Sequence, residues 1–345
     1  GTNNTYLGYN SGYGGTGSNS NNVGVGSSAL LAITTGARNV AVGTNALNDL
    51  TTNSIDASNG NTAIGYNAAA KIQTGASNVA IGTATLDNAA GAISECTIVG
   101  TRAGAAINNT AANGSTLIGY YAGTAITSGA GNTAIGYNSL TTATTEIGNT
   151  VMGHEAGKSI RHDASDYNVI MGHQASVGGT GARSQSIAIG YRAWGNGGSS
   201  NDIGGAENVF IGAESGGGTW VTGASDGNTA VGWNTMKGAM NGAANNTAFG
   251  KSSLFGLISG DENTAIGNQV AVGMTTGQQN VMIGSYASYN TVDADKTVMI
   301  GYNAGGTGNQ TSDADGSVAV GHSALLNLTS GIGNVGVGFE ALKVE

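Results

Sequence analysis

The sequence predicts an all-β fold, a parallel β-solenoid of about nineteen coils that forms one tandem-repeat array over residues 1–345. A five-residue phrase returns nineteen times, as in NTAIG at Asn61 to Gly65 and NVAIG at Asn78 to Gly82. Successive phrase-ending glycines are 17 to 22 residues apart and never closer. The chain contains no proline. A fixed minimum period indicates one stacked unit, and the lack of proline suits a continuous hydrogen-bonded ladder.

The columns of the phrase predict a short strand in every coil. The second position is Thr, Val or Ile in all copies, and the fourth is always apolar. These two positions share one face of an extended strand, where β-branched residues pack well. The third position points the other way and is often Ala, as at Ala63 and Ala134, and never charged. A strand that is apolar on both faces is expected to be buried on both.

This pattern leads to an expectation about assembly. We expect the second and fourth positions to build the interior of each coil. The third position then faces outward and forms the contact between chains. Because one coil covers a single face, the chains are predicted to associate, most simply as an elongated homotrimer. The alternative is a broader coil that buries both faces by itself, but 17 residues hold two short strands and two turns rather than three strands.

The remainder of each repeat predicts a turn, a second short strand and another turn. GTNAL at Gly43 to Leu47 and GHSAL at Gly321 to Leu325 illustrate the first part. TTGQQ at Thr275 to Gln279 illustrates the second turn, where Gly supplies positive φ and Thr bonds back to the backbone.

Composition excludes several classes of partner. The net charge is −9 with eleven Lys and Arg residues, so no basic stripe is available to neutralise nucleic-acid phosphates. No apolar run is long enough for a membrane-spanning helix, so membrane insertion is not expected. The chain starts at Gly1 and has no secretory signal, which suggests a processed product or a segment of a longer protein. No cofactor is expected.

The repeated phrases resemble those of known fibres. NTAIGYNA at Asn61 to Ala68 and NVAIG at Asn78 to Gly82, separated by TTG or TSG elements elsewhere, are similar to the repeats of phage tail fibres, which often carry an endosialidase-type intramolecular chaperone. They also resemble the repeats in heads of trimeric autotransporter adhesins. That resemblance implies left-handed parallel β-rolls packed as trimers, in an extracellular protein on a cell surface or virion.

Two columns are candidate structural ladders. Asn starts the phrase in fourteen copies, and stacked Asn side chains can hydrogen-bond from rung to rung inside a coil. The residue after the repeat Gly is aromatic or His in eleven copies, which predicts a stacked ladder at a corner or interface rather than a metal site. The residues singled out for these ladders are Asn61, Asn78, Asn132, Asn263, Tyr66, Tyr120, Tyr137, His154 and His173.

No catalytic constellation or metal signature is evident. No GxSxG elbow pairs with a His and an acid, and the carboxylates are dispersed. The calcium-binding nonapeptide pattern fails because Asn19, Arg183 and Gln310 stand where Asp would be needed. The single cysteine, Cys96, is interpreted as a small buried residue.

The predicted function is therefore a structural or adhesive extracellular fibre shaft, and not an enzyme. Recognition of a cell-surface glycan or receptor would fall on the loops between repeats, of which residues 48–60 and 196–207 are the longest. Trp194 and Trp220 are candidate glycan-stacking residues, with a packed loop anchor as the alternative. Two other functions stay open: an ice-binding solenoid, favoured by Thr97, Thr116, Thr133 and Thr150 but opposed by equally frequent Val, and a fibre-borne polysaccharide hydrolase.

Overall fold

The computed structural model describes all residues except 16, 53–59, 90–91, 161–163, 178–180, 196–203, 221–222 and 344–345. The chain divides into two compact units, Gly1–Tyr167 and Asn168–Glu345, each described here by itself. Both are parallel β-solenoids, so the predicted fold class is confirmed. No helix among the described residues is long and apolar enough to cross a membrane.

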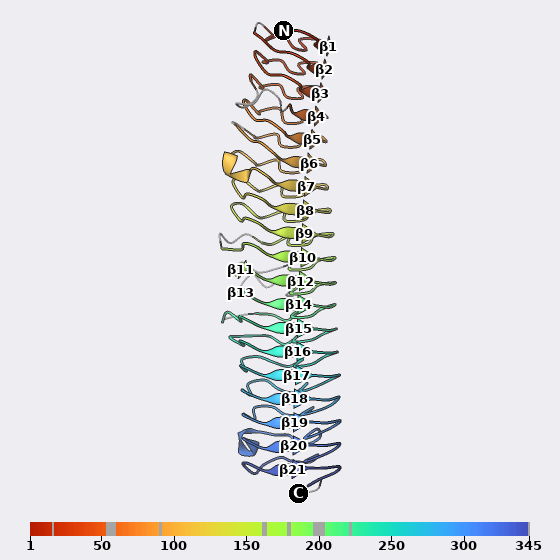
Figure 1. The fold of residues 1–345 in the computed structure, drawn as a ribbon, viewed down its shortest axis with the longest axis vertical. Helices are drawn as coiled ribbons and strands as arrows, with labels where there is room; N and C mark the ends of the chain where they lie inside the picture. The colour runs from red at the N-terminus through yellow and green to blue at the C-terminus, as the bar shows by residue number, and fades with distance from the viewer. Residues whose placement is uncertain are drawn as a thin grey trace. The chain divides into compact units, whose positions relative to one another are not determined.

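Unit 1 stacks nine three-residue strands in chain order, each parallel to the next (Figure 1). Equivalent residues of the phrase pair without any shift, as in Ala41 with Ala63 and Ala63 with Ala80. The elements are β1 (Thr5–Leu7), β2 (Val23–Val25), β3 (Val40–Val42), β4 (Thr62–Ile64), β5 (Val79–Ile81), β6 (Thr97–Val99), a 3-10 turn (Thr110–Ala112), β7 (Thr116–Ile118), β8 (Thr133–Ile135) and β9 (Thr150–Met152).

Unit 2 repeats this arrangement with ten stacked strands and one addition. Between successive coils, β11 pairs with β13, and Figure 1 places this pair on the opposite side of the coils from β12 and β14. The elements are β10 (Val169–Met171), β11 (Ala182–Ser184), β12 (Ile187–Ile189), β13 (Gly204–Ala206), β14 (Val209–Ile211), β15 (Thr229–Val231), β16 (Thr247–Phe249), β17 (Thr264–Ile266), β18 (Val281–Ile283), β19 (Val298–Ile300), a 3-10 turn (Ser312–Ala314), β20 (Val318–Val320) and β21 (Val335–Val337).

The second leg of each coil is not the β-strand that the sequence predicted. We call it the return leg. In the coil after β3, Asn45 and Leu47 adopt φ values of 57° and 49°, the left-handed region. The leg still forms a ladder between coils, because the Leu47 N–H donates to the Ala68 carbonyl at 3.0 Å and the Asp49 N–H to the Ala70 carbonyl at 2.9 Å. Alternating left-handed residues curl the backbone, so the leg is hydrogen-bonded without being extended.

The orientation predicted for the strands is wrong. The third phrase position is fully buried within the coil, as at Ala63 and Ala134, while the second and fourth positions lie on the outer surface. The physical reason is the narrow interior of a 17-residue coil. Strand and return leg lie so close together that only one side chain of each three-residue strand fits between them.

The core is filled by size matching across each coil. The inward strand residue packs against the residue six positions later on the return leg. In most coils the two differ inversely in size, although both are Ala in the pairs Ala63 with Ala69 and Ala265 with Ala271. Ala134 is matched by Leu140 and Leu117 by Gly123. A β-carbon on Gly123 would lie 2.9 Å from the methyl groups of Leu117. Pairing a large residue with a small one helps to fill the narrow interior while the individual residues vary.

Candidate functional site

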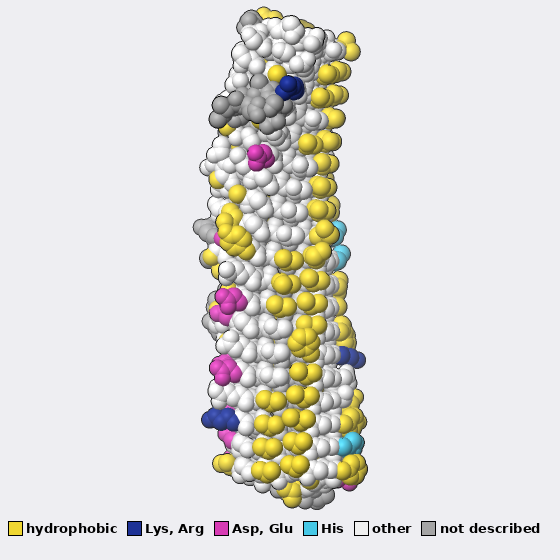
Figure 2. All heavy atoms as spheres, viewed as in Figure 1, with side chains coloured by type: hydrophobic (Ala, Val, Ile, Leu, Met, Phe, Trp, Pro, Cys, Tyr) yellow, Lys and Arg dark blue, Asp and Glu magenta, His cyan; other side chains and the backbone are white. Residues whose placement is uncertain are grey.

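The outer surface of the stacked strands is the most uniform feature of both units. We call it the outer strand face and define it as the first and third residues of each stacked strand. The third residue is apolar throughout, and the first is Thr, Val or Ile. Figure 2 shows the hydrophobic side chains as rows that follow the stack within each unit. Ile118 is 36% exposed in unit 1 and Ile266 is 39% exposed in unit 2. The face carries no charged residue.

The asparagine column forms a buried hydrogen-bond ladder beside the strands. The backbone N–H and Nδ2 of Asn263 both donate to Oδ1 of Asn246, at 3.0 and 2.9 Å. Nδ2 of Asn263 also donates to the Gly277 carbonyl at 2.7 Å, and Asn280 repeats the pattern on Asn263. Each amide therefore joins three successive coils. Asn61, Asn78 and Asn132 are buried in the equivalent ladder of unit 1.

The aromatic column stacks along an exposed corner. In unit 1 the Tyr120 and Tyr137 rings are 5.4 Å apart and 6° from parallel, and His154 stacks on Tyr137 at 5.0 Å and 11°. In unit 2 His173 stacks on Tyr191 at 5.7 Å. Tyr66 is exposed between coils that carry Thr44 and Thr83 at this position. The stacked rings cover one another's faces and present their edges to solvent, which supports the stacking-ladder interpretation.

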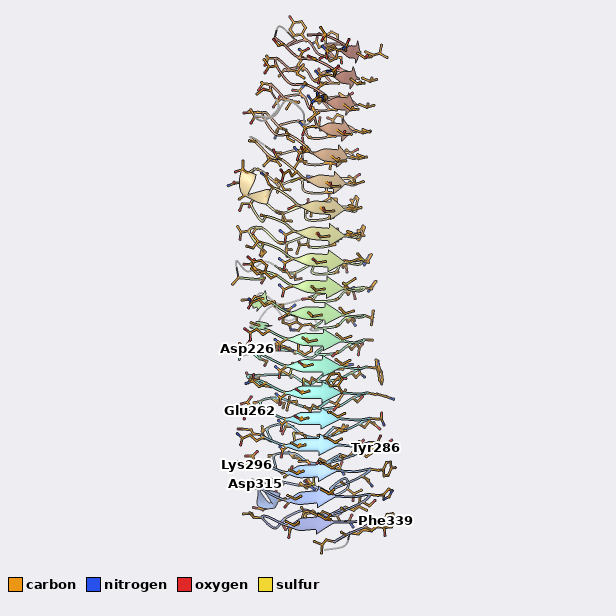
Figure 3. The ribbon with its side chains drawn as sticks, in the orientation of Figure 1. Asp226, Glu262, Tyr286, Lys296, Asp315 and Phe339 are labelled. Atoms are coloured by element: carbon orange, nitrogen blue, oxygen red, sulfur yellow. The ribbon has the colours of Figure 1, made fainter. Side chains whose placement is uncertain are left out.

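The opposite corner of the coils carries carboxylates that accept hydrogen bonds from neighbouring coils. Figure 3 shows Asp226, Glu262 and Asp315 of unit 2 at the edge opposite Tyr286 and Phe339. Asp315 accepts the Asp295 N–H at 2.7 Å, and Asp226 accepts the Ala206 N–H at 2.8 Å. These carboxylates hold neighbouring coils together. Within the described ranges, no group of three or more His, Cys, Asp or Glu side chains is arranged to hold a metal ion.

The two tryptophans predicted to stack on a glycan are buried, so the premise of exposed indoles is wrong. Trp194 is 1% exposed and Trp220 is 0% exposed. They pack on each other at 5.8 Å and on Phe210 at 5.7 Å, and the Arg183 guanidinium lies 4.9 Å from the Trp194 ring. β11 and β13 border these rings, because Arg183 belongs to β11 and a β-carbon on Gly205 of β13 would lie 3.1 Å from the Trp220 ring. Both act as packed anchors.

The predicted recognition loops fall largely outside the described residues. Of residues 48–60, positions 53–59 are not described, and of residues 196–207, positions 196–203 are not. Cys96 is described and fully buried, with Sγ 3.5 Å from the Ser94 carbonyl oxygen and 3.6 Å from that of Ala112. Burial raises the pKa of its thiol above the ordinary value, which keeps it protonated and unreactive.

A feature that the sequence did not point to lies on the return leg of unit 1. Two adjoining depressions, each of about 360 Å³, share Lys71 and Asp87 in their walls. Charges are scarce in this chain, and Asp49, Lys71, Asp87 and Arg102 come from successive coils. Their different positions in the repeat gave no sign that they border one groove.

Comparison with protein-family models and with curated protein sequences finds no match for this chain.

Proposed function

We propose that this chain is the structural shaft of an extracellular fibre, on a virion or cell surface, that assembles as a homotrimer through the outer strand face. The observation that carries the proposal is the outer strand face itself, which is apolar or Thr at every stacked strand and lacks charge. Exposed apolar patches of this regularity mark interaction surfaces in soluble proteins.

The dimensions of the face support an interface. Nine strands at about 4.8 Å spacing, each three residues long at about 3.3 Å per residue, give unit 1 a flat patch on the order of 400 Å². Unit 2 has ten such strands and a patch of similar size. The largest patches of ordinary monomers reach roughly 300–600 Å² and are often functional. Here the patch occurs in both units.

A three-fold arrangement suits the two different columns of the face. The column that precedes the repeat Gly is wholly apolar, whereas the column that follows Asn is half Thr. In a cyclic trimer each chain contacts two neighbouring chains. The wholly apolar column of one chain then lies against the half-Thr column of the next chain, and the third chain closes the ring. The buried Thr hydroxyls then find hydrogen-bond acceptors along the neighbouring backbone ladder.

Charge placed on the face should dissociate the assembly. Wild-type protein is expected to show the mass of three chains by size exclusion with light scattering. The double variant Ile64→Lys with Ile118→Lys should show the monomer mass, because burying an unpaired ammonium group is strongly unfavourable. The matched control is Thr44→Lys with Thr83→Lys, which adds the same charge at exposed corner positions and should stay trimeric.

Far-UV circular dichroism of all three proteins establishes that each is folded. A wild-type protein that is monomeric at micromolar concentration contradicts the proposal. So does a face variant that retains the trimer mass.

A second candidate, ice binding, is favoured by one observation. Thr97, Thr116, Thr133 and Thr150 lie on consecutive coils of the outer strand face, not in the interior where the sequence placed them. The neighbouring column is Val99, Ile118, Ile135 and Met152, so no second rank of Thr accompanies the first. We expect no thermal hysteresis from the wild-type protein. Thermal hysteresis that is lost in Thr116→Lys with Thr133→Lys would establish ice binding instead of the fibre.

A further inference from the structure

The groove on the return leg of unit 1 has small side chains in its floor. It follows the coils that contain β3 to β7, on the side of each coil away from the outer strand face. Its floor includes Ala70 and Ala105, at the fifth position after the repeat Gly. The same position holds Phe255 in unit 2. Ala70 and Ala105 therefore leave space at a position that a large ring fills in the coil of Phe255.

The charges of the groove alternate from coil to coil. Asp49, Lys71, Asp87 and Arg102 come from the coils of β3, β4, β5 and β6 in turn. Successive coils are about 4.8 Å apart, so the four groups span on the order of 15 Å. Among the residues that the structure describes, no ion pair joins any of these four side chains to another charged group. Most hydrogen-bond donors and acceptors of these four side chains face solvent.

Amide groups add donors and acceptors to the same walls. Asn45 donates from Nδ2 to Oδ1 of Asn67 at 3.0 Å, which fixes the orientation of both amides. Lys71 makes one long contact, from Nζ to Oδ1 of Asn88 at 3.4 Å. The Lys71 ammonium thus keeps donor capacity for a ligand.

An aromatic ring continues the row beyond Arg102. Tyr121 occupies the equivalent position in the next coil, and the Arg102 guanidinium lies 5.6 Å from the centre of its ring. Tyr121 is half-buried, and Tyr120 packs at 4.4 Å beside it. Arg102 lines the groove, and the Tyr121 ring lies beside it, next to one end of the groove.

We propose that this groove binds an extended neutral oligosaccharide that lies along the stack of coils. Sugar hydroxyls both donate and accept, so they pair with carboxylates, ammonium and guanidinium groups and amides. The two acids and two bases sum to no net charge, which gives no preference for an acidic ligand. The C–H faces of a sugar pack on a ring such as Tyr121. The proposal does not rest on trimer assembly, since none of these residues belongs to the outer strand face.

The test is a glycan microarray carrying neutral, carboxylated and sulfated oligosaccharides, followed by calorimetric titration with the strongest binder. Wild-type protein should retain neutral oligosaccharides. Ala105→Phe should weaken binding at least tenfold by filling the groove, and Phe255 shows that the coil accommodates Phe at this position. Lys71→Met and Asp87→Asn should each weaken binding by about fivefold to tenfold, as expected for one lost polar contact.

The matched control is Val272→Phe, which places the same ring at the same coil position in unit 2, outside the groove. It should bind like the wild type. Failure of every neutral oligosaccharide on the array to bind overturns the proposal, as does undiminished binding by a folded Ala105→Phe variant. Retention confined to sulfated or carboxylated glycans would equally rule out a neutral ligand.

Discussion

Replacing Gly119 with Ala is expected to unfold the coils around β7 and β8 and to lower the free energy of unfolding of unit 1 by at least about 3 kcal/mol. Gly119 has φ of +140°, a conformation that side chains with a β-carbon rarely adopt. An added β-carbon would lie 2.3 Å from the carbonyl oxygen of Gly136 in the next coil. That oxygen belongs to the backbone of the stack, so it cannot move without breaking the ladder.

The matched control is Gly131→Ala in the same unit. Gly131 also has positive φ, +62°, but an added β-carbon would meet nothing within 4 Å. Its expected cost is about 1 kcal/mol, from the left-handed conformation alone. Urea unfolding followed by far-UV circular dichroism compares the two, and amide hydrogen exchange at β7 and β8 locates the damage. Equal midpoints for the two variants would show that the close approach of coils does not dictate glycine.

Replacing Asn263 with Leu is expected to have the second large effect, a loss of about 3–5 kcal/mol in unit 2. The substitution keeps the number and branching of the side-chain heavy atoms but removes every hydrogen bond of the side chain. It leaves the Asn280 N–H and the Gly277 carbonyl without their partner, whereas Oδ1 of Asn246 still accepts the backbone N–H of residue 263. Each unsatisfied buried group costs about 1–3 kcal/mol, and partial relaxation reduces the sum.

A graded comparison distinguishes the ladder from simple packing. Asn263→Ser should cost less than the Leu variant, because a hydroxyl still provides an acceptor. Ser186 already does this, accepting the Asn208 N–H at 3.0 Å while donating to the Ser184 carbonyl at 2.8 Å. The measurement is again the urea midpoint. A Leu variant as stable as the Ser variant would mean that the buried column is selected for size and not for hydrogen bonding.

The sequence contains signals for the observed strand orientation, in which the third phrase position points into the coil. Residues two apart on a strand share a face, so Asn61 and Ala63 must point the same way. An internal Asn ladder therefore requires an internal third position, which contradicts the orientation first predicted. The inverse size relation between positions six apart, as in Ala134 with Leu140 and Leu117 with Gly123, is a second signal that both positions line one interior.

The groove and the tryptophans needed the three-dimensional structure. Nothing in the spacing of Asp49, Lys71, Asp87 and Arg102 says that they border one hollow, because they occupy three different positions of the repeat. Trp194 and Trp220 come from two coils with different additions, and they are buried against each other beside the β11 and β13 pair. Residues inserted between repeats change the local cross-section of the coil, and the length of the repeat alone does not show that change.

The sequence by itself determined that the chain forms a parallel β-solenoid, that a strand falls on each copy of the five-residue phrase, and which columns stack. The reason is that residues at equivalent positions of a repeat pair in the same hydrogen-bonded register in every coil. Only the tertiary structure decided which strand face is the interior and what the return leg looks like. The physical reason is the width of the coil: with room for one inward side chain from each three-residue strand, the interior takes Ala63 or Leu117 and leaves the β-branched residues outside. Which side chains lie inside therefore depends on the distance between the strand and the return leg of the same coil.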